Sequence, residues 1–72
     1  KAVLREALAL LLKVRDMVCK ALDGETDALD SVPENLRFSD ACASMEVAVD
    51  ALNSALDHID DARDDIKEAT EV

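Results

Sequence analysis

The sequence predicts an all-α fold in which two long antiparallel helices form a helical hairpin with coiled-coil-like packing. Three observations support it. Apolar residues recur at alternating steps of three and four in both halves of the chain, a helical period. The composition includes only one aromatic residue, one Gly and one Pro, too few for strands and frequent turns. One break, over residues 31–38, separates the two periodic stretches. At 72 residues, we expect a single domain spanning 1–72.

The second half predicts a helix over residues 39–70, with Ser39 as its N-cap and Asp40 favourably placed in the first turn. Large residues and Ala alternate along its heptad seam, so a partner helix can approach closely between the large side chains. The seam positions are Ala41, Met45, Ala48, Leu52, Ala55, Ile59, Ala62, Ile66 and Ala69.

The first half predicts a helix over residues 2–30. Gly24 costs about 1 kcal/mol inside a helix, but Ala28 and Leu29 keep the register, so we expect the helix to continue through it. Arg15 and Glu25 interrupt the apolar seam; they either specify register or extend their charged ends to solvent. The seam consists of Leu4, Leu8, Leu11, Val18, Leu22 and Leu29, and beside it lie Val3, Ala7, Leu10, Val14, Met17, Ala21 and Ala28.

The connection over residues 31–38 contains Pro33, which cannot continue the preceding helix. Ser31 and Glu34 have the spacing of a capping box, so a single helical turn is expected there. A connection this short makes the helices antiparallel neighbours. With the turn centred near Asn35, Val18 faces Leu52, Leu11 faces Ile59 and Leu4 faces Ile66. The same register predicts that Lys13 pairs with Asp57, Lys20 with Asp50, and Arg5 with Asp64 or Asp65.

Two helices cannot cover apolar faces this wide, because side chains beside the seam edges stay half exposed: Leu10, Leu12, Met17, Val49 and Leu56. We therefore expect two hairpins to dimerise into an antiparallel four-helix bundle. The candidate residues for the core and for self-association are Leu4, Leu8, Leu11, Val18, Leu22, Met45, Leu52, Leu56, Ile59 and Ile66.

The charge is strongly negative and unevenly distributed. The net charge is −9, with residues 1–22 at +3 and residues 23–72 at −12. Direct binding to nucleic acid or to an anionic membrane is therefore not expected, whereas a basic protein surface would be a natural partner. The candidate acidic partner surface is Asp57, Asp60, Asp61, Asp64, Asp65 and Glu68. These residues form either a solvated helix face or a mimic of a row of phosphates.

Motifs for catalysis are absent. The chain contains no phosphate-binding Gly-rich loop, no Cys-x-x-Cys and no Glu-x-x-His, so we expect no enzymatic activity, no cofactor and no metal. His58 beside Asp57 and Asp61 is interpreted as a solvated histidine, with a surface metal contact as the alternative. Cys19 and Cys42 lie about 13 Å out of step in the hairpin, beyond disulfide reach, and are expected to be reduced thiols of a cytoplasmic protein.

The connection and second helix contain a recognisable set of residues: Glu25-Thr26-Asp27-Ala28-Leu29-Asp30-Ser31-Val32-Pro33-Glu34-Asn35-Leu36, then Ser39-Asp40, Met45-Glu46, Ala48, Asp50, Leu52, Ala55, Asp57, Ile59, Ala62 and Ile66. In these residues the chain resembles, over about residues 20–67, a group of small acidic helical proteins from Firmicutes and their phages. The resemblance implies a helical hairpin of bacterial or phage origin and favours an accessory role such as binding a host protein. It carries no site residue, and Asp40-Ala41 stands where Glu-Arg is usual.

Three functional hypotheses follow. The first is a non-enzymatic, self-associating protein-interaction module. The second is a phage-type inhibitor that mimics nucleic acid through its acidic second helix. The third is a small-ligand binder with its pocket between protomers.

Overall fold

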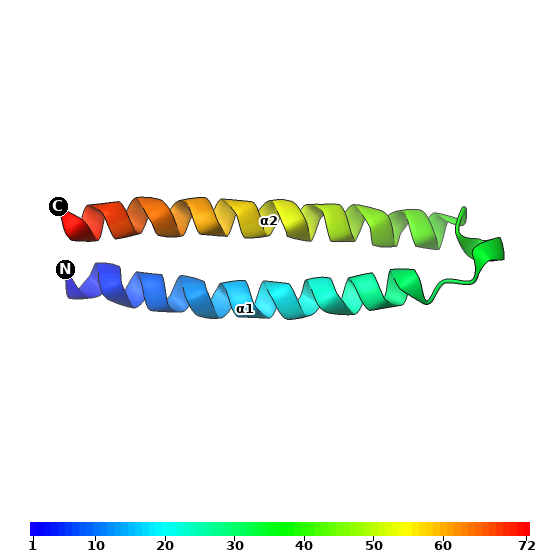
Figure 1. Ribbon diagram of the computed structural model, residues 1–72, viewed down its shortest axis with the longest axis horizontal. Coiled ribbons are helices and arrows are strands. Elements are labelled where there is room, and N and C mark those ends of the chain that lie inside the picture. The colour runs from blue at the N-terminus through cyan, green and yellow to red at the C-terminus, as the bar shows by residue number, and fades with distance from the viewer.

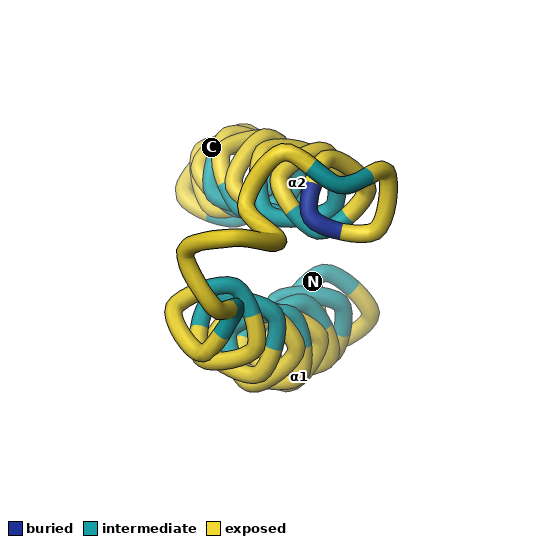
Figure 2. Tube along the Cα trace, turned by 90° about the vertical axis from the view of Figure 1, so that its right-hand side faces the viewer, coloured by how far each residue is buried: buried dark blue, intermediate teal, exposed yellow.

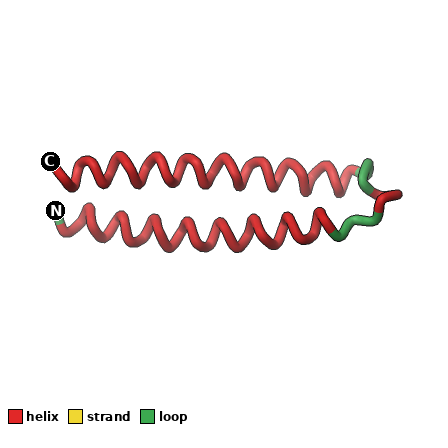
Figure 3. Tube along the Cα trace, in the orientation of Figure 1, coloured by secondary structure: helices red, strands yellow, loops and turns green.

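The computed structural model describes all residues 1–72 and consists of two long helices joined by a short connection (Figure 1). Helix α1 spans Ala2–Asp30, a 3-10 turn η1 spans Glu34–Leu36, and helix α2 spans Asp40–Glu71. The helices lie side by side and antiparallel, with both termini at one end and the connection at the other (Figure 3). The all-helical hairpin is confirmed, and each helix begins and ends within one residue of its predicted bounds.

The hairpin is a thin rod. It measures 55 × 15 × 12 Å, and its radius of gyration is 16.4 Å, whereas a compact chain of this length would have a radius of gyration of about 11 Å. No third element packs on the pair, because α1 and α2 account for all of the long helices. Each long helix therefore has one neighbour and leaves most of its circumference in solvent.

The start of α2 has the predicted cap: the backbone N–H of Cys42 donates a hydrogen bond to Ser39 Oγ at 3.2 Å. The predicted turn in the connection is present as η1, but the capping box does not form. Ser31 Oγ instead donates to the backbone carbonyl of Asp27 at 2.8 Å, and no side chain caps η1. Ser31 follows the last turn of α1, whose carbonyls lack helical partners and are the nearest acceptors.

The half-buried residues form one stripe on each helix, and the two stripes face each other (Figure 2). On α1 the stripe follows the predicted seam, with Arg15 and Glu25 inside it and half-buried. On α2 the seam is half-buried from Met45 to Ile66, but its two end positions are exposed. They are Ala41 and Ala69.

Gly24 lies inside α1, as expected, with an ordinary helical backbone. A methyl group added at its Cα would meet nothing within 4 Å. We expect Gly24→Ala to stabilise the fold by about 1 kcal/mol, since glycine loses more backbone entropy in a helix than alanine does. The midpoint of thermal unfolding, followed by circular dichroism, should rise by about 4–8 °C.

Gly24→Pro is the matched control for this substitution. It should lower the melting temperature sharply, because proline removes a helical hydrogen bond and clashes with the preceding turn. A lower melting temperature for Gly24→Ala would contradict a continuous α1.

Candidate interaction surface

The ten candidate core residues all lie in or beside the seam, and all ten are half-buried. None is fully buried. The one buried residue in the chain is Cys42, which is 2% exposed in the first turn of α2. Two helices in contact along a single line can exclude water from only part of each side chain. The seam therefore joins the helices without forming a closed interior.

A second apolar stripe lies on α1 one position before each seam residue, and we call it the outer stripe. Its large members are strongly exposed: Val3 is 78% exposed, Leu10 57%, Val14 44% and Met17 62%. The candidate residue set omitted this stripe, although its steps of four and three are visible in the sequence. The outer stripe is Val3, Ala7, Leu10, Val14, Met17, Ala21, Gly24 and Ala28.

Helix α2 has no comparable second stripe. Its one exposed large apolar residue before the C-terminal Val72 is Val47, at 67%. Val49 and Leu56, beside its seam, are half-buried, as expected. In the connection, Leu36 is 50% exposed and Phe38 is fully exposed. The apolar surface without a covering element therefore belongs mainly to α1.

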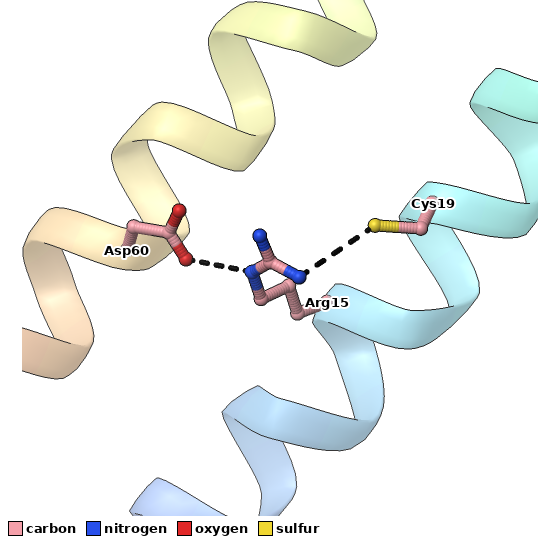
Figure 4. Close-up of polar contacts among 3 residues, drawn as sticks. All are labelled: Arg15, Cys19 and Asp60. Atoms are coloured by element: carbon pink, nitrogen blue, oxygen red, sulfur yellow. Dashed lines mark hydrogen bonds and ion pairs between the residues drawn. The ribbon is translucent and has the colours of Figure 1, made fainter.

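One ion pair joins the helices. Arg15 Nε donates to Asp60 Oδ1 at 2.8 Å, and Arg15 Nη1 lies 3.8 Å from Cys19 Sγ (Figure 4). Both charged side chains are partly exposed, at 36% and 44%. The hydrogen bond to Asp60 and its negative charge raise the pKa of Arg15 above its usual value. Arg15 thus connects the helices across the seam, whereas Glu25 forms no ion pair.

The ion pairs predicted for Lys13 with Asp57 and Lys20 with Asp50 do not form, and neither does a pair from Arg5 to Asp64 or Asp65. Lys13, Lys20, Asp50 and Asp57 occupy the heptad position farthest from the seam, and all four are exposed. Residues at the same level along the hairpin can therefore point in opposite directions. The predicted pairs followed from the register along the hairpin alone and did not take account of the face of each helix on which the side chains lie.

The candidate acidic partner surface divides into two parts. Asp57, Asp61, Asp64, Asp65 and Glu68 are exposed and form no ion pair. Asp60 differs from them: it is half-buried, and its carboxylate is bound to Arg15. The freely exposed set is therefore smaller than the six residues expected from sequence.

The remaining polar residues form no concentrated site. Cys19 and Cys42 are free thiols, and no three His, Cys, Asp or Glu side chains converge as a metal site would need. A shallow hollow on α2 is lined by Asp40, Ala43, Ser44 and Val47, all from one helix, so it does not enclose a ligand. Neither helix has a stretch apolar enough to cross a membrane.

Comparison of the chain with protein-family models, with characterised proteins and with solved structures gives no match. The resemblance to small acidic helical proteins therefore stays an expectation. Function has to be argued from the surfaces of the hairpin itself.

A double-mutant cycle with Arg15→Met and Asp60→Asn should give a favourable coupling energy in urea unfolding. Raising the NaCl concentration should reduce this coupling, because both side chains are partly exposed and are screened by salt. Lys13→Met with Asp57→Asn is the matched control and should give no coupling. Equal coupling in the two cycles would contradict a specific Arg15–Asp60 contact.

The raised pKa of Arg15 determines how the protonation of this side chain affects stability as the pH changes. A raised folded-state pKa contributes stability that is complete below the unfolded-state pKa and is lost only as the pH rises through the folded-state value. For an arginine both values lie in the strongly alkaline range. Across the neutral range, the proton of Arg15 therefore adds no pH dependence to the free energy of unfolding.

Proposed function

We propose that this chain is a non-enzymatic, self-associating helical hairpin that acts as a protein-interaction module. The observation that carries the proposal is the near absence of an interior: one residue of 72 is buried. Small domains depend on buried apolar area for stability, and helical hairpins commonly obtain it by packing against further helices. A second hairpin would supply the missing neighbours.

The exposed area supports the same conclusion. The hairpin exposes 5321 Å², whereas a folded monomer of its mass would expose about 4400 Å². The excess, about 900 Å², is close to the area of about 800 Å² that each partner buries in a standard interface. The simplest assembly is a homodimer in which two hairpins form an antiparallel four-helix bundle. Free Cys19 and Cys42 favour a reducing compartment, the cytoplasm.

A second candidate function rests on the acidic surface of α2. Its five exposed carboxylates are not neutralised by the chain's own cations, so their field is available to a basic protein. In this function the helix would occupy a groove that normally holds nucleic acid. The net charge of −9 would speed the encounter with such a partner.

The mass in solution tests the leading proposal. Light scattering across a protein concentration series should give a dimer or larger species that dissociates on dilution. Helicity, measured on the same samples, should fall as the mass falls, because the isolated hairpin has little interior. A helical monomer at every concentration would rule out self-association.

Charge reversal tests the second candidate. Asp57→Lys, Asp61→Lys and Asp64→Lys, combined, should abolish competition with duplex DNA for a basic DNA-binding domain while leaving helicity unchanged. The control reverses three exposed carboxylates of α1, Asp16, Asp23 and Asp27, and gives the same net charge. Equal loss in both triple variants would mean that only net charge matters and would count against a mimic on α2.

A further inference from the structure

We propose that the outer stripe of α1 packs antiparallel against the same stripe of a second copy, so that two α1 helices form the centre of the dimer. This inference deepens the proposed self-association and rests on it. The stripe has eight positions at heptad spacing, and none of them is charged. Its large members include four of the six exposed large apolar side chains within the two helices; the other two are Leu12 of α1 and Val47 of α2.

The position of the stripe on α1 suits a bundle. Each outer-stripe residue precedes a seam residue by one, and consecutive residues of an α-helix are about 100° apart around the axis. The covered face and the uncovered face of α1 are therefore nearly at right angles. A helix in a four-helix bundle contacts two neighbours at about this angle.

The stripe is complementary to itself when two copies run in opposite directions. Its large residues lie in the first two thirds, while its last three positions are Ala21, Gly24 and Ala28. An antiparallel pair that uses all eight positions sets two large residues of each copy against Ala of the other, which lets these layers interdigitate, and brings two small residues together in the layer between them. The facing residues are Val3 and the partner's Ala28, Ala7 and the partner's Gly24, Leu10 and the partner's Ala21, and Val14 and the partner's Met17.

The α2 helix of a second copy is a poorer occupant. Outside its seam, α2 exposes only Val47 as a large apolar side chain before its C-terminal residue, and charged residues dominate its outer faces. Packing it on the outer stripe would set apolar residues against carboxylates such as Asp61 and Asp65, which would lose hydration without gaining a partner. A second α1 sets only uncharged stripe residues against one another and places its charged side chains on the flank of the contact.

Salt dependence separates these two arrangements. In the α1-on-α1 register, the flanking charges meet like with like: Lys13 lies near the partner's Lys20, and Glu6 near the partner's Asp27. Each protomer also carries a net charge of −9. Added NaCl should therefore tighten the dimer, because it screens these repulsions. An α1-on-α2 contact would join basic and acidic segments and would weaken with salt.

Disulfide trapping tests the register directly. In a Cys19→Ala, Cys42→Ala background, chains with Leu10→Cys are mixed with chains carrying Ala21→Cys and are oxidised gently. The heterodimer disulfide should form to the near exclusion of either homodimer. The pair Val14→Cys and Met17→Cys should behave alike. A dominant Leu10→Cys homodimer would mean a parallel contact and would overturn the proposal.

A matched pair of substitutions identifies the face. Leu10→Glu should convert the dimer to a monomer, whereas Leu12→Glu, on the opposite flank of α1, should leave the mass unchanged. Both leucines are about half exposed, 57% and 46%, so neither is needed to hold the hairpin together. Dissociation by Leu12→Glu alone would overturn the α1-on-α1 contact while leaving self-association in place. A parent chain that is monomeric at every concentration would overturn both proposals.

Discussion

The structure depends on one line of contact between two helices. A helix that has a single neighbour can bury only one stripe, and only partly, so the ten core residues are all half-buried and Cys42 alone is buried. The rod shape and the exposed outer stripe follow from the same constraint. A second hairpin packed on the uncovered face, as proposed, would supply most of the remaining burial. In the proposed dimer, association and folding would therefore be coupled.

Of the two charged residues in the α1 seam, Arg15 is the one that forms an ion pair with α2. It lies where an apolar residue would otherwise pack, and its guanidinium leaves the seam to reach Asp60. Their contact favours the level and the side at which the helices meet. A charge-bearing seam position costs apolar contact, but it favours one register over its neighbours.

The helices, the Ser39 cap and the turn could be predicted from sequence because each depends on residues within one or two turns. The absence of ion pairs from Lys13 and Lys20 could not be predicted in the same way. The register gives the level of a residue along the hairpin but not the direction in which its side chain points around the helix. The capping box failed because Ser31 had a competing acceptor in α1. The heptad spacing of the outer stripe is visible in the sequence, but this spacing alone does not identify the surface that packs against the stripe.

The two proposed interactions use different helices and are therefore compatible. If α1 forms the centre of a dimer, Asp57 and Asp64, which occupy the heptad position of α2 farthest from the seam, remain on its outside. Two copies then present two acidic surfaces on one particle, and a partner with two basic sites would bind with an affinity raised by the second contact. Residues 1–22 carry a net charge of +3, so the negative charge of the chain lies mainly on α2, the helix that would stay accessible in the dimer. Self-association would in this way prepare the surface for a basic partner.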